Sequence, residues 1–308
     1  MTSPGPFLQQ FKLRRPQAGP GWITRPRLLQ RLDRVLQKPI ALISAPAGFG
    51  KTTLLTQWLE RCPLPNAYLQ LGRDDHEIQA FMTGVIAALR QIFPHALQKT
   101  SDLLHAQVPV PLDIWISTID GDLEQLQDTP YVLALDDYQL VGNPAIDLLL
   151  TGILQIETKG LHLIISARRS PSLSFSRLKA QDRVFEITTS DLRFTNTEGL
   201  AYLEQSTQIS FDDGSINQIF EKTEGWAVGL TLAAISLRDG AQPEDIFANL
   251  DRFDRQVSCY LLDQVFNLQP EEIQLFLLKT ATFNQFCAAM LSEVFGGNQS
   301  EAEIQAML

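Results

Sequence analysis

One stretch of the sequence combines the residue types that bind phosphate groups. Residues 45–53 have the sequence APAGFGKTT, after the apolar run Ile40–Ser44 and at the start of Thr52–Arg61, which has helical spacing. This is the GxxxxGK[ST] pattern of a Walker A loop. Backbone N–H groups of such a loop converge on a phosphate, and Gly48 and Gly50 permit the close approach. The pattern therefore predicts a nucleotide-binding site.

The residues of this loop have separate predicted roles. Lys51 supplies a positive charge for the β- and γ-phosphates, Thr52 offers a hydroxyl to Mg²⁺, and Thr53 is placed to contact the α-phosphate. Ala45 stands where the general pattern has Gly. The alternative is a chance Gly-rich turn, and the Lys-Thr pair between a strand and a helix argues against it. The predicted nucleotide contacts in the loop are Ala45, Pro46, Ala47, Gly48, Phe49, Gly50, Lys51, Thr52 and Thr53.

A second element supplies paired carboxylates. Tyr131–Leu135 is an apolar run that is followed by Asp136 and Asp137. A carboxylate at the C-terminal end of the strand neighbouring the phosphate loop can hold Mg²⁺, and a second acid can polarise an attacking water. We assign Asp136 to Mg²⁺ and Asp137 to water activation. The alternative is a solvated loop after a strand. The pair predicts hydrolysis of the nucleotide.

A third element follows the next predicted strand, Leu161–Ser166. Arg168 after its end would face the γ-phosphate as a sensor, with Arg169 as the second choice. An ordinary exposed Arg is the alternative interpretation. The four histidines lack HExxH or i, i+4 pairing, so no histidine metal site is expected. The sequence contains no GxSxG elbow, and its spacing suggests no Cys/His pair.

The elements that must position these residues alternate between strands and helices. Such alternation predicts an α/β fold, with a parallel sheet covered by helices on both faces. From about residue 196 only helical patterns follow. The predicted strands are Ile40–Ser44, Ala67–Leu71, Tyr131–Leu135, Leu161–Ser166 and Val184–Thr188. The predicted helices are Pro26–Leu36, Thr52–Arg61, Glu77–Phe93, Leu112–Gln127, Thr197–Gln205, Ser215–Thr223, Trp226–Leu237, Pro243–Asn249, Phe253–Phe266 and Glu271–Thr280.

Composition limits the class of protein. The 308 residues are 44% hydrophobic and 19% charged, which excludes a disordered or collagen-like chain. Three cysteines far apart in the sequence exclude a disulfide framework and a CxxC zinc site. No stretch approaches the roughly 18 apolar residues of a membrane span. We therefore expect a cytoplasmic protein with no membrane partner. The chain stops at Leu308 within a helical pattern, from which we expect a fragment of a longer protein.

Charge is distributed unevenly along the chain. Residues 1–60 hold 9 Lys and Arg against 2 Asp and Glu, a balance of +7, and residues 61–308 hold 16 against 33, a balance of −17. A basic arm can indicate nucleic-acid binding, but beside a phosphate loop its positive field would serve a nucleotide equally well. The acidic remainder, without a basic recognition helix, predicts that this chain alone does not bind duplex DNA specifically.

Short motifs along nearly the whole chain carry a resemblance to a known family. They are Thr24–Leu29, Ser44–Leu55 with Gln57 and Trp58, Leu135–Tyr138, Arg168 with Pro171, Arg177 and Leu178, Asp191–Phe194, and Thr223–Ala227. In these motifs the sequence resembles the STAND (signal-transduction) ATPases, and among them the MalT-like LuxR-type transcriptional regulators. Ala at the first Walker A position is usual in that family. Gln139 departs from the family's frequent His, and Ser170 from its frequent Asp.

This resemblance implies a nucleotide-controlled switch and its domains. In such proteins a P-loop domain and a helical lid are followed by a winged-helix domain that clamps the nucleotide in the resting state. From the resemblance we expect the last domain to be cut short at Leu308. The implied domains are an N-terminal arm at 1–22, a P-loop NTPase domain at 23–195, a helical lid at 196–250 and a winged-helix-like domain at 251–308.

The resemblance also implies ligands and partners. ATP, ADP and Mg²⁺ are the expected cofactors, and self-association is expected in the ATP state. Ile23 and Arg25 would lie near the adenine, and Gly225–Ala227 would be the lid motif that contacts the nucleotide from the other side. Trp226 in that motif should then lie near the phosphate loop, the alternative being an ordinary core Trp. An inducer would bind a superhelical sensor domain, and DNA a C-terminal helix-turn-helix, both absent from this chain.

Two other functions stay open at this point. A P-loop kinase or transferase acting on a small molecule would need an acceptor pocket and a lid with several arginines, and 196–250 contains only Arg238. A module that holds ADP without hydrolysing it is the third possibility, and the paired acids Asp136 and Asp137 argue against it.

Overall fold

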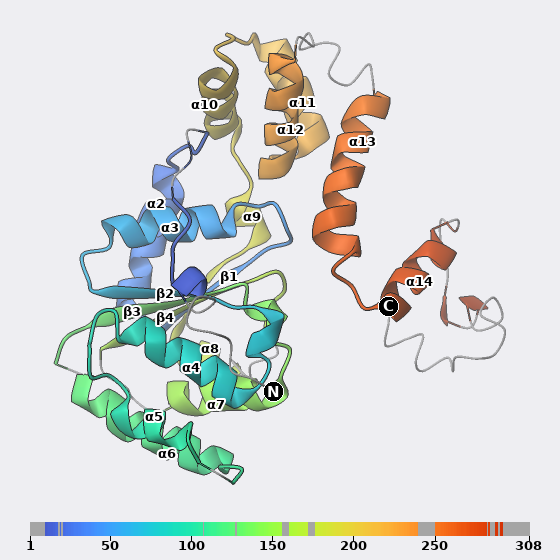
Figure 1. Ribbon diagram of the computed structural model, residues 1–308. Helices are drawn as coiled ribbons and strands as arrows, with labels where there is room; N and C mark the ends of the chain where they lie inside the picture. Colours follow the sequence, from blue (N-terminus) through green and yellow to red (C-terminus); the bar gives the residue numbers. More distant parts are fainter. Residues whose placement is uncertain are drawn as a thin grey trace. The chain divides into compact units, whose positions relative to one another are not determined.

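The chain divides into two compact units, Met1–Glu244 and Asp245–Leu308. Each unit is described by itself (Figure 1). The first contains the sheet and the lid helices, and the described part of the second contains the helices α13 (Leu250–Leu261) and α14 (Glu271–Thr280). The computed structural model describes residues 10–17, 19, 21–106, 108–126, 128–155, 160–171, 176–239, 250–281, 283, 287, 288, 290 and 291.

A five-stranded parallel sheet forms the centre of the first unit. The strand order is β2-β3-β4-β1-β5, and every pair of neighbours is parallel. The predicted α/β class is therefore confirmed, and each predicted strand is present to within one residue at either end. The strands are β1 (Ile40–Ser44), β2 (Asn66–Gln70), β3 (Tyr131–Asp136), β4 (Leu161–Ala167) and β5 (Val184–Ile187).

One expectation about the sheet is wrong. The strand that carries Asp136 was expected to neighbour the strand of the phosphate loop, but β4 lies between β3 and β1. Ile43 of β1 is in register with Ser166 of β4, and Leu135 of β3 with Ile165 of β4. Local sequence gives no information on this order, because all three strands are mainly apolar.

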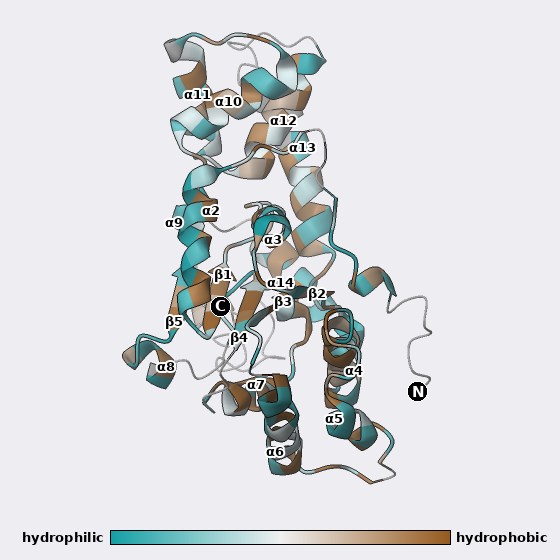
Figure 2. Cartoon of the chain, turned by 90° about the vertical axis from the view of Figure 1, so that its left-hand side faces the viewer, coloured by the Kyte–Doolittle hydropathy of each residue, from teal (hydrophilic) through white to brown (hydrophobic). Residues whose placement is uncertain are grey.

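Both faces of the sheet are buried under helices, which explains these continuous runs. Alternate residues of β1 enter two different cores: Ile40 and Leu42 pack with α4, α6 and α7, whereas Ala41 and Ile43 pack with α2 and α3. Figure 1 shows α2 and α3 on one side of the sheet and α4 and α7 on the other. In Figure 2 hydrophobic residues gather along the strands and on the helix sides around them. The helices are α2 (Pro26–Leu32), α3 (Lys51–Arg61), α4 (Ile78–Leu89), α6 (Leu112–Leu123) and α7 (Pro144–Gln155).

Several helices differ from the predicted ones. The predicted helix Pro26–Leu36 continues past α2 as a 3-10 helix over Asp33–Gln37. The predictions for α4 and α6 each extended four residues beyond the observed C-terminal end. Four helices, α7 among them, were not singled out, and three of these have six residues or fewer. The short ones are α5 (Gln98–Leu103), α8 (Ser176–Ala180) and α9 (Thr189–Leu192).

Three helices form the lid within the first unit: α10 (Asn196–Thr207), α11 (Asp213–Thr223) and α12 (Ala227–Arg238). Capping defines where α10 begins, because Thr195 Oγ1 accepts from the Glu198 amide at 3.2 Å and Glu198 Oε2 accepts from the Thr195 amide at 3.1 Å. The Phe194 amide donates to the Gly225 carbonyl at 2.9 Å. This bond ties the segment that enters the lid to the turn before α12.

The second unit contains α13 (Leu250–Leu261), a π-helical turn over Leu262–Phe266 and α14 (Glu271–Thr280). The predicted helix Phe253–Phe266 therefore ends in a wider turn. The predicted helix Pro243–Asn249 lies outside the described residues, as does much of 251–308, so the winged-helix domain stays a prediction. Within the described part of the chain, no helix has the length and apolar character needed to cross a membrane.

Candidate functional site

The loop between β1 and α3 presents its backbone amides to one point. Gly48 and Gly50 both have φ of +79°, a conformation that glycine adopts without steric cost. The Ala45 amide donates to the Ala167 carbonyl at 3.2 Å and so fixes the start of the loop against β4. Over the described residues, no protein acceptor takes a hydrogen bond from the amides of 47–53. Free amides at the N-terminus of an 11-residue helix form a cradle for an anion.

Lys51 brings a positive charge to this cradle. Its side chain is buried, and Nζ donates to the carbonyls of Ala45 at 2.8 Å and Pro46 at 3.0 Å. Burial lowers the pKa of Lys51, and the negative charges of Asp137 and Asp136 oppose that shift. The ammonium group therefore lies within the field of both acids, at the place where a phosphate would meet the loop.

Asp136, fully buried at the end of β3, contacts the first turn of α3 directly. Its Oδ2 accepts from Thr52 Oγ1 at 2.7 Å and from the Tyr68 hydroxyl at 3.0 Å, and its Oδ1 accepts from the Asp137 amide at 3.0 Å. Burial, together with the charge of Asp137, raises the pKa of Asp136. The contact with Thr52 exists although β4 separates the two strands.

Thr52 and Asp136 have the chemistry to hold Mg²⁺ beside a phosphate. Among the described residues no group of three or more His, Cys, Asp or Glu could hold a metal ion alone. Mg²⁺ is usually held by one or two carboxylates together with phosphate oxygens. The hydroxyl and the carboxylate 2.7 Å apart fit that donor set. The predicted metal ligands are thus brought together at the phosphate loop.

Asp137 has an unusual backbone conformation that directs its carboxylate. Its φ is +58°, in the left-handed region that non-glycine residues rarely adopt. Its Oδ1 accepts from Gln139 Nε2 at 3.0 Å and its Oδ2 from Gln70 Nε2 at 3.4 Å. Strain of this kind persists where surrounding contacts enforce it, and it concentrates at functional sites. Both carboxylate oxygens are therefore held by side-chain amides.

Gln139 connects this acid to the predicted sensor. While its Nε2 donates to Asp137, its Oε1 accepts from the Arg168 amide at 2.9 Å. The charge of Arg168 contributes to lowering the pKa of Lys51. Arg169 and Ser170 are exposed. Sequence reasoning noted Gln139 only as a departure from the family and missed Gln70 and Tyr68.

A cavity of about 730 Å³ opens beside the phosphate loop. The N-terminal segment, α3 and the lid helices α10 and α12 surround it, and its volume lies in the range of small-molecule sites. The predicted adenine neighbours Ile23 and Arg25 both line it. The other lining residues are Gly19, Gly21, Trp22, Gly48, Gly50, Thr53, Leu54, Gln57, Phe194, Tyr202, Gln205, Ser206, Ala227, Val228, Thr231 and Arg238.

The guanidinium of Arg25 is hydrogen-bonded to other groups of the protein. It donates to the carbonyls of Leu192 at 2.8 Å and Arg193 at 2.7 Å and pairs with Glu198 Oε2 at 2.9 Å. Its carbon Cζ lies 4.0 Å from the centre of the Phe194 ring. Arg25 thus anchors the segment that enters α10. Its polar atoms position one wall of the cavity, and its place near an adenine stays a prediction.

The lid contacts the phosphate loop at Ala47 and Gly48. The indole N–H of Trp226 donates to the Ala47 carbonyl at 3.1 Å, and the Val228 amide donates to the Gly48 carbonyl at 3.1 Å. A Cβ atom on Gly48 would lie 2.7 Å from Val228 Cγ2 and 2.8 Å from Trp226 Nε1. Trp226 therefore lies beside the loop. Its role as a nucleotide contact stays a prediction.

This contact gives a testable expectation for the two loop glycines. Gly50→Ala places a Cβ in open space at φ +79°, so only backbone strain of about 1–2 kcal/mol is expected. Gly48→Ala adds overpacking against the lid, which typically costs another 1–3 kcal/mol. Urea unfolding should therefore show a larger loss of stability for Gly48→Ala. Equal losses would mean that the lid does not rest on the loop in solution.

Comparison with known proteins agrees with this geometry. The chain is 27% identical over 307 residues to the HTH-type transcriptional regulator MalT of Cronobacter sakazakii, and 26% identical over 301 residues to MalT of Yersinia enterocolitica. The resemblance to MalT-like regulators is confirmed. Each match covers 96% of this chain but 33% of the relative, its N-terminal third, so the chain spans about a third of those proteins. No protein-family model matches the chain.

Solved structures share its fold. The Walker-type ATPase of Pyrococcus abyssi has a TM-score of 0.57 at 13% identity, over 96% of this chain and 91% of that protein. A STAND protein with a tetratricopeptide repeat sensor from Pyrococcus horikoshii has a TM-score of 0.52 at 16% identity, over 96% of this chain and 39% of that protein. The fold is that of P-loop ATPases.

Proposed function

We propose that this chain is the ATP-binding and ATP-hydrolysing part of a MalT-like transcriptional regulator, acting as a cytoplasmic switch. One observation carries the proposal: Lys51, Thr52 and Asp136 meet at a loop whose amides have no protein acceptor among the described residues. The adjoining cavity of about 730 Å³ has room for a nucleoside. The similarity to MalT regulators supports the same function.

Each residue then has a part in binding or hydrolysis. The loop amides and Lys51 hold the phosphates, while Thr52 and Asp136 hold Mg²⁺, which would offset charge on the β- and γ-phosphates. Asp137 accepts a proton from the attacking water, and Arg168 stabilises charge on the γ-phosphate. Burial of Lys51 and Asp136 strengthens their electrostatic interactions.

The lid gives this site a way to control conformation. Because Trp226 and Val228 bond to the carbonyls of the loop itself, a change in loop occupancy reaches the lid directly. A ligand shifts such an equilibrium only through different affinities for its two states. We propose that ADP favours the closed lid, and that ATP favours opening and self-association. Inducer and DNA would act through the rest of the longer protein.

Phosphate release with and without acceptors tests this proposal against the kinase alternative. A transferase acting on a small molecule would pass the γ-phosphate to a second substrate. The lid contributes a single arginine, Arg238, to the cavity wall. We expect slow, Mg²⁺-dependent release of inorganic phosphate that candidate acceptors do not accelerate. Phosphorylated acceptor without free phosphate would support the kinase instead.

The bridging position of Gln139 leads to a prediction about turnover. Gln139→Leu removes the donor to Asp137 and the acceptor for the Arg168 amide together. Partners that orient a reacting group typically contribute 10- to 100-fold, so ATP turnover should fall by about that factor while ATP affinity changes little. Gln125→Leu, on the exposed surface, is the control. Parent-like turnover in Gln139→Leu would show that Asp137 needs no such support.

A further inference from the structure

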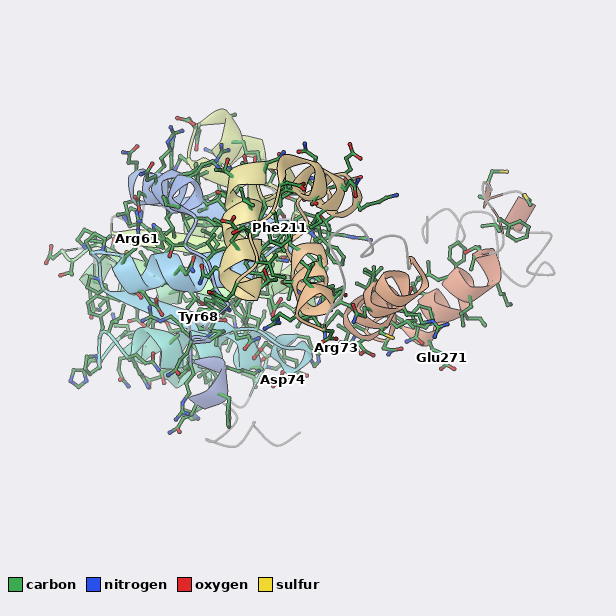
Figure 3. All side chains as sticks on the ribbon, turned by 90° about the horizontal axis from the view of Figure 1, so that it is seen from above. Arg61, Tyr68, Arg73, Asp74, Phe211 and Glu271 are labelled. Carbon is green, nitrogen blue, oxygen red and sulfur yellow. The ribbon has the colours of Figure 1, made fainter. Side chains whose placement is uncertain are left out.

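Tyr68 on β2 reaches from the sheet core to the metal end of the site. In the parallel register Tyr68 is opposite Ala134, one alternate position before Asp136 on the same face of β3. Its ring is 1% exposed and lies in the core beneath α3 with Trp58. Figure 3 shows Tyr68 in the interior of the first unit. The packing fixes the ring and therefore the direction of its hydroxyl.

The hydroxyl of Tyr68 and that of Thr52 meet at one oxygen. Asp136 Oδ2 accepts from Tyr68 at 3.0 Å and from Thr52 at 2.7 Å, while the Asp137 amide holds Oδ1 at 3.0 Å. Donors on both oxygens determine the plane of the carboxylate, and the carboxylate is fully buried. Tyr68 donates from β2, outside the phosphate loop and outside the Asp136-Asp137 pair.

Another tyrosine shows that packing alone does not explain this hydroxyl. Tyr131 on β3 is as deeply buried as Tyr68, and its hydroxyl has no hydrogen-bond partner among the described residues. The sheet core therefore holds a tyrosine ring whether or not its hydroxyl is bonded. The bond from Tyr68 to Asp136 is a specific feature of the site.

We propose that Tyr68 is a positioning residue that orients the Asp136 carboxylate for Mg²⁺ and so sets the affinity of the nucleotide site for the metal. Hydrogen-bond partners of a metal-binding carboxylate fix its direction, and removing them typically costs 10- to 100-fold in metal affinity. The inference rests on the proposed function, because it assigns a metal role within the same site. Tyr68 itself touches neither metal nor nucleotide.

The test measures binding and does not depend on catalysis. A non-hydrolysable ATP analogue is titrated into the full chain over a range of Mg²⁺ concentrations and in EDTA. For Tyr68→Phe the Mg²⁺ concentration at half-maximal enhancement of binding should rise about 10-fold or more. Affinity in EDTA should stay within about twofold of the parent, because the loop amides and Lys51 are unchanged.

Two matched variants separate positioning from stability. Tyr138→Phe also removes a buried phenol that donates to a carboxylate, Asp147 at 2.6 Å, and Tyr131→Phe removes a hydroxyl with no partner among the described residues. Neither should change the Mg²⁺ dependence. Tyr68→His keeps a ring that is too short to bring a donor to Asp136, so it should shift the Mg²⁺ dependence as Tyr68→Phe does. Circular dichroism checks the fold of each, and the His variant serves alone if Tyr68→Phe does not fold.

The possible outcomes distinguish a failure of the positioning role of Tyr68 from a failure of the proposed function. Unchanged Mg²⁺ dependence in Tyr68→Phe, an equal shift in Tyr138→Phe, or an equal loss of binding in EDTA would overturn the positioning role while nucleotide binding stands. If Tyr68→Phe does not fold, parent-like Mg²⁺ dependence in Tyr68→His overturns it as well. A parent chain that does not bind the analogue at all would overturn the proposed function and the inference together.

Discussion

Lys51→Ala is expected to lower the affinity of the chain for ATP and ADP by roughly 10- to 150-fold. The estimate corresponds to about 1.5–3 kcal/mol for hydrogen bonds that involve a charged group. Lys51 is held by two loop carbonyls at 2.8 and 3.0 Å, so its ammonium group is already in place when a phosphate arrives. Calorimetric titration of the variant and the parent measures the difference.

A surface lysine gives the control for this experiment. Lys99 is exposed, so Lys99→Ala removes the same charge from the chain without touching the loop. Its affinities should match those of the parent, because an exposed charge at a distance is screened by salt. Unchanged affinity for ATP and ADP in Lys51→Ala would show that the phosphate loop does not bind the nucleotide.

Asp137→Asn should stop turnover and leave nucleotide bound. A general base contributes about 10²- to 10⁴-fold to rate, and the amide cannot accept the proton that the carboxylate would take from water. Ground-state contacts to the phosphates come from the loop, so the affinity for ATP should stay near that of the parent. Single-turnover phosphate release and equilibrium binding, measured on the same preparation, report the two effects separately.

The neighbouring acid should behave differently. Asp136→Asn alters the partner of Thr52 and Tyr68 and should weaken Mg²⁺-dependent binding as well as turnover. If Asp137→Asn hydrolysed ATP at the parent rate, the catalytic base would lie elsewhere and the pair would serve the metal alone. If both variants lost binding equally, the separate roles of the two acids would be wrong.

The strands could be predicted from the sequence because a parallel sheet buried on both faces imposes continuous apolar runs. The short helix α5 could not, because its position depends on a distant residue: the Thr100 amide donates to the buried Asp122 carboxylate at 2.8 Å, 22 positions away. The order of the strands is also a property of the whole fold. Nothing in the local sequence of β4 indicates that it lies between β1 and β3.

In the candidate site too, some residues could be predicted from the local sequence and others depend on the whole fold. Lys51, Thr52 and Asp136 follow a spacing that the chemistry of phosphate binding requires, so the motif indicated them. Tyr68 and Gln70 follow no motif, because their carboxylate partners lie 68 and 67 positions further along the chain. The sequence does show polar groups on the β2 residues Tyr68 and Gln70 and acids at the end of β3. Linking them requires knowing that β2 pairs with β3.

Titration calorimetry with Mg²⁺ and ADP, on the full chain freed of co-purified nucleotide, tests the central claim most directly. The geometry predicts one site per chain, with binding abolished or strongly weakened in Lys51→Ala and unaffected in Lys99→Ala. Absence of binding by the parent chain at millimolar ADP and ATP would contradict the account, as would binding that Lys51→Ala leaves unchanged.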